Sequence, residues 1–136
     1  MTNQNLVRVR VERFFSDTHG TATVEAVLWL PIFMFILALV TDAALIYSSQ
    51  SQAMRIVQDA NRSMSVGRLR SIEDTEAFIL LHLATISPNA SVETVVNDGV
   101  IISHVEMPVT DLSATRMIPG FADLRVGVTA QHVSEI

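Results

Sequence analysis

One carboxylate in this sequence stands where a charge is unfavourable. Glu25 directly precedes residues 26–40, a run of fifteen residues without a charged or polar side chain. At the edge of such a run, a carboxylate needs a positively charged partner or a proton. A cut after Gly20 would supply the partner, because Thr21 would become a free α-amine about one helical turn from Glu25. In an assembly of parallel helices, the glutamate of one subunit would pair with the terminal ammonium of its neighbour, which would neutralise both charges and set the stagger between subunits.

Residues typical of enzymes are few. The chain has no cysteine, all of its basic residues are arginine, and no serine lies in a G-x-S-x-G nucleophile elbow. No phosphate-binding loop or dinucleotide fingerprint is present. His104 and Glu106 share one face of an expected strand and His132 could fall on a neighbouring strand, but two ligands at i and i+2 are common by chance. We therefore predict a protein that is not an enzyme, with no catalytic residues, no metal site and no cofactor.

Composition excludes several other classes. Hydrophobic residues make up 49% of the 136 residues, charged residues make up 17%, and the formal net charge is −5. Such a chain is too apolar to be disordered. The absence of cysteine excludes a disulfide scaffold or thiolate metal site. The acid excess argues against nucleic-acid binding, which requires a basic surface.

The apolar residues are concentrated in one segment. Residues 21–47 contain 21 apolar residues out of 27. As a helix this segment would be about 40 Å long, which is enough to cross a bilayer core of about 30 Å. Trp29 lies near one end and Tyr47 at the other, as is typical of interfacial aromatic residues. A buried core helix is the alternative, although a core helix seldom needs fifteen consecutive apolar residues.

The distribution of arginine predicts the orientation of this span. Arg8, Arg10 and Arg13 precede it, whereas six arginines and ten acids follow Tyr47. Short basic segments stay in the cytoplasm. We therefore expect one span in the bacterial inner membrane, with a cytoplasmic N-terminus and a periplasmic C-terminal part.

The junction and the span together resemble a known family. Residues 20–25 read GTATVE, which looks like the type IV prepilin cleavage motif. The longer string GTATVEAVLWLPIFMFILALVTDAALIY is similar to the TadE-like proteins, the minor pseudopilins of the tight-adherence (Flp-type) pilus system. The matching features are the spacing from Gly20 to Glu25, Pro31 six residues further on, and Asp42 near the far end. The resemblance covers residues 15–47.

This resemblance implies a function in assembly. A prepilin peptidase would cut between Gly20 and Thr21, with Gly20 as the recognition residue, and Glu25 would serve subunit docking. The implied partners are the peptidase, other pilin or pseudopilin subunits, the inner-membrane assembly platform and the lipid bilayer. The implied role is pilus assembly and surface adhesion, with possible incorporation into an extracellular pilus.

Pro31 and Asp42 lie within the span, and each has two possible roles. Pro31 removes a hydrogen bond to the carbonyl of Val27 and should bend the helix. The bend could help subunits pack, or the proline could simply be tolerated. Asp42 is expected at the outer interface, where solvation is the simpler interpretation and a polar contact to a partner span is the other.

Two alternatives to cleavage after Gly20 are open. One is a conventional signal peptide, for which residues 41–43 are a poor cleavage site. The other is an uncleaved single-span protein with a periplasmic binding or interaction domain, since the Gly20–Glu25 spacing can occur by chance.

Beyond the span, periodicity predicts a small α+β domain. The helix should continue to about residue 66 through an apolar stripe of Ala53, Val57, Ala60 and Met64, with Gly67 as its C-cap. Ser71 should cap a second helix that ends near residue 85 and is well buried. Ala77, Leu80, Leu81 and Ala84 form one apolar face of it, which Phe78, Ile79 and Leu83 widen.

Three antiparallel strands should follow this second helix. Residues 91–96 and 100–105 should form a hairpin around an Asn97-Asp98-Gly99 turn, and Pro108 should end the second strand. Residues 111–120 should form a loop, and residues 124–131 alternate as a third strand.

The predicted fold is thus a pilin-like, membrane-anchored α+β protein. It consists of a leader (1–20), a transmembrane helix (21–47), an extension of this spine helix (48–70) and a small exported domain (71–136).

Overall fold

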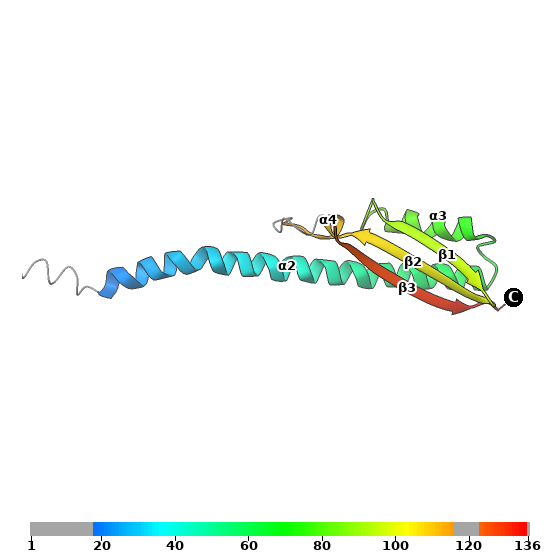
Figure 1. Cartoon of the computed structure of the whole chain (residues 1–136), viewed down its shortest axis with the longest axis horizontal. Helices are drawn as coiled ribbons and strands as arrows, with labels where there is room; N and C mark the ends of the chain where they lie inside the picture. The colour runs from blue at the N-terminus through cyan, green and yellow to red at the C-terminus, as the bar shows by residue number, and fades with distance from the viewer. Residues whose placement is uncertain (1–17, 116–122, 136) are drawn as a thin grey trace, which may run out of the picture. The chain divides into compact units, whose positions relative to one another are not determined.

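The computed structural model describes residues 18–115 and 123–135, and side chains from residue 23 onward. Residues 1–17 of the predicted basic leader lie outside the described residues. The elements follow in the order α2, α3, β1, β2, α4, β3 (Figure 1). The chain divides into two compact units, Met1–Leu39 and Val40–Ile136. The α+β class, the long N-terminal helix, the second helix and the three-stranded antiparallel sheet are as predicted.

Helix α2 spans Thr18–Ser65 and contains 48 residues. It begins three residues before residue 21, the predicted start of the transmembrane helix. Gly67 follows its C-terminal end with a φ of 75°, a conformation that glycine adopts without strain. The Gly67 N–H donates to the Met64 carbonyl and the Arg68 N–H donates to the Ser63 carbonyl. These two bonds form a Schellman motif, which satisfies carbonyls at the helix end. The predicted C-cap is therefore confirmed.

Helix α3 spans Ile72–Leu83, with Ser71 as its N-cap. The Asp74 N–H donates to Ser71 Oγ over 3.1 Å, which confirms the predicted capping interaction. The predicted burial of this helix is confirmed for Ile79 and Leu83 and is wrong for Leu80 and Leu81. Its buried residues are Thr75, Ile79 and Leu83, whereas Leu81 is 73% exposed. Because the helix is apolar nearly all round, periodicity could not identify the face that meets the core.

The Ser71 cap gives a direct test of helix stability. Ser71→Ala should destabilise the folded head by about 1 kcal/mol, because the Asp74 N–H loses its acceptor. Urea titration of the full chain in detergent, read by pulse proteolysis, measures this change. Ser71→Asp is the matched control and should retain stability, since aspartate also caps helices. An unchanged midpoint for Ser71→Ala would contradict the capping role.

The sheet has the order β1-β2-β3, formed by Ser91–Asn97, Val100–Pro108 and Arg125–Val133. All neighbouring strands are antiparallel. Asp98 and Gly99, with φ of 48° and 76°, form the two-residue turn between β1 and β2, as expected for an Asp-Gly hairpin.

The expected loop after β2 contains a short helix. Residues Val109–Leu112 form α4, a single helical turn between the second and third strands. Pro108 stands immediately before it as the N-cap. A four-residue helix lacks the repeat from which periodicity identifies longer helices, so the sequence predicted only a loop here.

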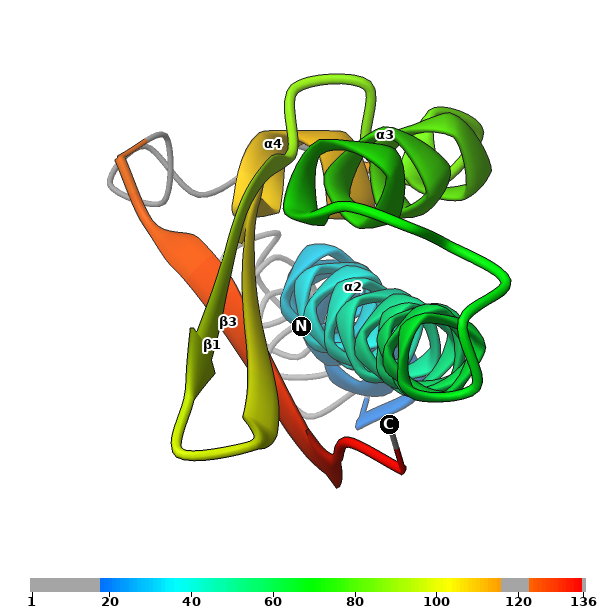
Figure 2. The ribbon, with the colours of Figure 1, turned by 90° about the vertical axis from the view of Figure 1, so that its right-hand side faces the viewer.

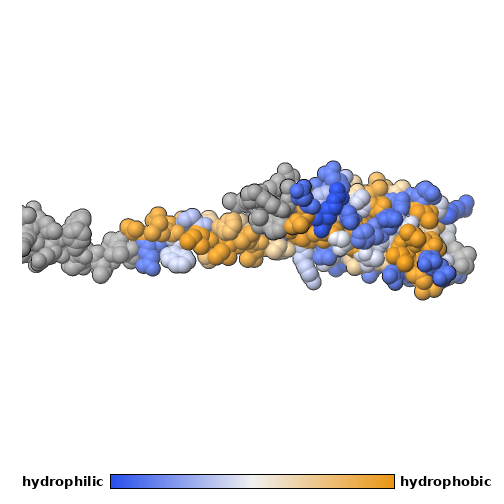
Figure 3. Space-filling view, viewed as in Figure 1, coloured by the Kyte–Doolittle hydropathy of each residue, from blue (hydrophilic) through white to orange (hydrophobic). Residues whose placement is uncertain are grey.

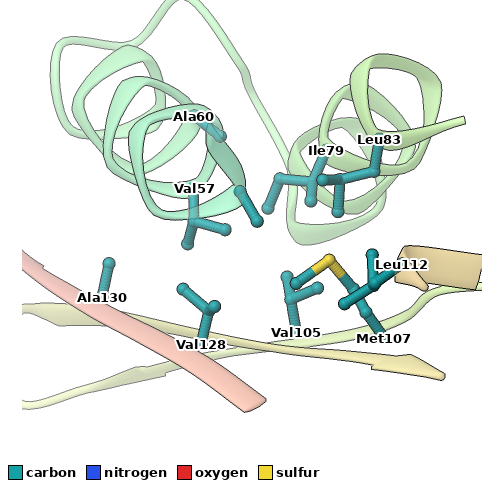
Figure 4. Close-up of a cluster of buried hydrophobic side chains, with 10 residues drawn as sticks. Val57, Ala60, Ile79, Leu83, Val105, Met107, Leu112, Val128 and Ala130 are labelled. Atoms are coloured by element: carbon teal, nitrogen blue, oxygen red, sulfur yellow. The ribbon is translucent and has the colours of Figure 1, made fainter. Parts of the chain in front are cut away.

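The core of the head lies between the sheet and two helices. Within the unit that begins at Val40, α2 and α3 lie on the same side of the sheet (Figure 2). The buried cluster draws on α2, α3, α4, β2 and β3 (Figure 4). Its members are Ala53, Val57, Ala60, Ile79, Leu83, Val105, Met107, Leu112, Val128 and Ala130. Three of the four residues in the predicted α2 stripe are thus in the core.

Candidate assembly helix and its junctions

The first half of α2 exposes an unusual amount of apolar surface. Most of its large apolar side chains between Val24 and Tyr47 are 40–73% exposed. Figure 3 shows this apolar surface in orange. Among the described helices, α2 is the one that is long and apolar enough to cross a membrane. No residue of its most apolar stretch is buried within the chain, so the alternative of a buried core helix is wrong.

The predicted cleavage junction lies within the first turns of α2. The backbone of Gly20 and Thr21 is already helical. Thr21 and Glu25 are therefore separated by one turn along the same side of the helix. Glu25 is exposed, and no hydrogen bond or ion pair to it is found among the described residues.

Pro31 lies inside α2, and the helix continues on both sides of it. The proline ring has no N–H, so the carbonyl of Val27 lacks its usual donor within the helix. The surrounding side chains are exposed, including Trp29 at 59% and Phe35 at 46%. The bend at this position stays a prediction.

Asp42 connects α2 to a distant part of the head. Its Oδ1 accepts hydrogen bonds from the backbone N–H groups of Ala114 at 2.9 Å and Thr115 at 3.1 Å. Its Oδ2 accepts a hydrogen bond from the Thr115 hydroxyl. Asp42 is only 7% exposed, so the expectation that its carboxylate is solvated is wrong, whereas its position at the outer interface stays a prediction. We call this set of three bonds the Asp42 clasp.

A second carboxylate fixes the same end of the head. Asp111 in α4 accepts hydrogen bonds from the Ser87 hydroxyl at 2.8 Å and from the Asn89 backbone N–H at 3.0 Å. These residues belong to the loop between α3 and β1. The segment after β2 is thus held to α2 through Asp42 and to the loop after α3 through Asp111.

A buried polar chain links α2 to all three strands. The Asn61 amide donates to the Ala130 carbonyl in β3 at 3.0 Å and accepts from the Ser103 hydroxyl in β2 at 2.6 Å. Ser103 Oγ is in turn 2.9 Å from the hydroxyl of Thr94 in β1. Asn61 and Ser103 are fully buried, and Thr94 is 5% exposed. Because each polar group is satisfied, this chain specifies how α2 sits on the sheet.

The opposite face of the sheet carries a half-exposed polar row. His104 Nδ1 is 2.7 Å from Thr129 Oγ1, and His104 Nε2 is 3.6 Å from Glu106 Oε1. Glu106 Oε2 is 4.0 Å from the Arg125 guanidinium. The side chains of His104, Glu106 and Arg125 are 44–51% exposed, so solvent screens their interactions.

His104 and His132 lie on opposite faces of the sheet. His132 pairs with Ile101 on the helix-facing side of the sheet, so it points away from His104. Among the residues that the structure describes, no group of three or more histidine, cysteine, aspartate or glutamate side chains could hold a metal ion. The polar row contributes charge to an open surface.

Sequence reasoning missed Asp111 and Asn61 and assigned the wrong environment to Asp42. Each of these side chains has partners 22 to 73 residues away along the chain. A polar residue within an apolar helical stripe was the available signal, and Asn61 carried it beside Ala60. The signal identifies a buried polar group but not its partner.

Part of this chain matches a known protein family. Residues 20–62 match the model of the TadE-like protein family, as the sequence resemblance indicated. The match begins at the predicted junction and covers most of α2, including Glu25, Asp42 and Asn61. No curated protein and no solved structure matches this chain.

Proposed function

We propose, from the TadE-like match on residues 20–62, that this chain is a minor pseudopilin of a tight-adherence (Flp-type) pilus. The match associates the chain with that pilus system and with a generally non-enzymatic family. The observation that carries the proposal is the coincidence of this match with the exposed apolar half of α2. The chain works by assembly, and surface adhesion is a property of the pilus that it helps to build.

The apolar half of α2 serves two environments in turn. Residues 22–41 form 20 residues of helix, or about 30 Å, which matches the hydrocarbon core of a bilayer. Lipid covers this surface before assembly, and helices of other pilin or pseudopilin subunits cover it afterwards. Between such helices, packing and buried polar contacts provide the attraction, because lipid is as apolar as the side chains.

Glu25 supplies the polar contact in this arrangement. Cleavage after Gly20 removes 20 of the 136 residues and leaves Thr21 as the new N-terminus. The terminal ammonium of one subunit then neutralises the exposed Glu25 carboxylate of the next. Because the bilayer and the helix bundle are both apolar, an offset that leaves either charge unpaired is disfavoured.

The basic leader places the cleavage site on the cytoplasmic side. Arg8, Arg10 and Arg13 hold the N-terminus in the cytoplasm, and the acidic head is exported to the periplasm. A prepilin peptidase therefore meets Gly20 from the cytoplasmic side of the inner membrane. The assembly platform in the same membrane then receives the processed chain.

Processing provides the sharpest test of this function. The chain is expressed with an active prepilin peptidase, with an inactive peptidase and without one, and its N-terminus is then sequenced. We expect a new N-terminus at Thr21 only with the active enzyme. Gly20→Ala, Gly20→Val and Gly20→Leu should lose processing progressively, because a larger side chain keeps the enzyme from the backbone.

The same experiment distinguishes the competing functions. A chain that keeps its leader in cells that make pili would contradict the pseudopilin proposal and favour an uncleaved single-span protein with a periplasmic interaction domain. A new N-terminus near residue 43 would instead indicate a conventional signal peptide.

A further inference from the structure

One face of α3 is apolar and is left uncovered by the rest of the head. Ala77, Leu81 and Ala84 follow one another at the spacing of a single helical face, and all three are exposed. Leu80 beside them is 41% exposed, and Leu81 is 73% exposed. We call these four residues the outer face of α3. A contiguous exposed apolar surface of this kind is typical of a protein interaction site.

A shallow groove of about 450 Å³ runs along α2 within the head. Its lining residues come from three turns of the helix and are Tyr47, Gln50, Ser51, Met54, Arg55 and Gln58. Tyr47 is 73% exposed, and Met54 is half-buried against the core. We call this hollow the α2 groove. Its aromatic and thioether side chains suit it to an apolar side chain from outside the chain.

The two helical surfaces carry opposite charges. Residues 47–70 contain four arginines and one aspartate, which gives a net charge of +3. Helix α3 contains three acids and no arginine, which gives −3 with its histidine neutral. The single aspartate, Asp59, lies four residues after Arg55 and three before Arg62, so cations flank it on its own helix. Within the described part of the chain none of these charges forms an ion pair, so their attraction is available between copies.

The charged and apolar groups of the two helices also match in height. Helix α3 follows α2 after a short turn and runs back alongside it in the opposite direction (Figures 1 and 2). Asp74 stands in the first turn of α3, and Arg62 stands in the last turn of α2. Leu81 comes seven residues after Asp74, and Arg55 comes seven residues before Arg62, about 10 Å in each case. In a parallel copy at the same height, Asp74 therefore meets Arg62 while Leu81 meets the α2 groove.

We infer that the outer face of α3 in one copy packs against the α2 groove of a second, parallel copy, with Leu81 in the groove and Asp74 beside Arg62. The inference rests on the proposed function, because copies anchored in one membrane present their heads in the same orientation. The contact joins two different surfaces, so a third copy can add at either side. Such an open-ended contact extends an assembly, whereas a symmetric contact would end at two copies.

Cross-linking between two tagged copies tests this contact. The chain contains no cysteine, so Leu81→Cys in one copy and Gln58→Cys in another each place one thiol at an exposed position. The two full-length chains carry different tags, are expressed together and are oxidised in the membrane. We expect dimers that carry both tags, because helices in contact lie about 8–10 Å apart and bring these thiols within reach of a disulfide. Leu81→Cys paired with Gln131→Cys, an exposed position in β3, is the matched control and should give only a background yield.

Two results of this experiment would overturn the inference. Leu81→Cys copies that link to one another as readily as to Gln58→Cys copies would indicate a symmetric pairing of two α3 helices. Equal yields with the Gln58→Cys and Gln131→Cys partners would indicate random collision in the membrane.

Charge reversal tests the contact between Asp74 and Arg62. Arg62→Glu in the Gln58→Cys copy should lower the yield of mixed dimers about threefold, because an exposed attraction becomes a repulsion. Asp74→Arg in the Leu81→Cys copy should then restore the yield. Both side chains are exposed, and pulse proteolysis of each variant checks that its head stays folded. A folded double variant without restored yield would contradict this contact.

N-terminal sequencing of the same samples separates the inference from the function on which it rests. Processing after Gly20 without a link between positions 81 and 58 would leave the proposed function standing and overturn the inference. A link between these positions in a chain that is never processed would support the contact and contradict the pseudopilin function.

Discussion

A Glu25→Ala chain is expected to be cut after Gly20 and inserted in the membrane, yet to be absent from assembled pili. The carboxylate is exposed and no partner for it is found among the described residues, so its loss leaves the head intact. The terminal ammonium of the neighbouring subunit would lose its counter-charge in apolar surroundings, where an unpaired charge is strongly unfavourable. N-terminal sequencing measures the processing, and immunodetection in sheared pili measures the incorporation.

Two further variants isolate the charge at this position. Glu25→Gln keeps the size of the side chain and removes its charge, so it should fail as Glu25→Ala does. Asp59→Ala removes an exposed carboxylate from the head half of α2 and should be incorporated normally. Normal incorporation of both Glu25 variants would contradict the pairing of Glu25 with the terminal ammonium of the neighbouring subunit. Apolar packing alone would then set the stagger between subunits.

Asn61→Ala is expected to destabilise the folded head by about 2–4 kcal/mol, because a buried side chain with two hydrogen bonds is lost. The Ser103 hydroxyl loses its acceptor, the Ala130 carbonyl loses a donor, and the substitution leaves a cavity at a fully buried position. Urea titration of the full chain in detergent, with pulse proteolysis, gives the change in the free energy of unfolding.

The matched control for Asn61 lies one turn earlier in the same helix. Gln58 is exposed, so Gln58→Ala should change the free energy of unfolding by less than about 0.5 kcal/mol. Ser103→Ala in the Asn61→Ala background should cost less than Ser103→Ala alone, because the two side chains share one hydrogen bond. Additive effects of the two substitutions would show that this bond contributes nothing measurable.

Local signals in the sequence predicted most of the elements. Gly67 and Ser71 end and begin helices through their own backbone conformation and hydroxyl, so neighbouring residues suffice to identify them. The same is true of Asp98-Gly99, whose positive φ values define the hairpin. These predictions succeeded because the interactions close within a few residues.

Interactions between distant segments could not be predicted in this way. Asp42 lies beside an apolar run, and its position alone suggested a membrane interface, whereas its donors lie at Ala114 and Thr115. The burial of α3 was misassigned for a related reason, since Leu81 and Leu83 are equally apolar and only the neighbouring elements decide which one is covered. The candidate junction at Gly20 and Glu25 stays a prediction, and it rests on spacing within one helix.

The link between Asn61 and Ala130 has a consequence for the order of events during export. In the proposed orientation α2 enters the membrane first, and β3 crosses after every other element of the head. Until β3 arrives, the Asn61 amide and the adjacent apolar stripe of α2 lack their cover and stay open to chaperones and proteases. Folding of the head is therefore coupled to translocation, and a protease-resistant head reports that residues 125–133 have crossed the membrane.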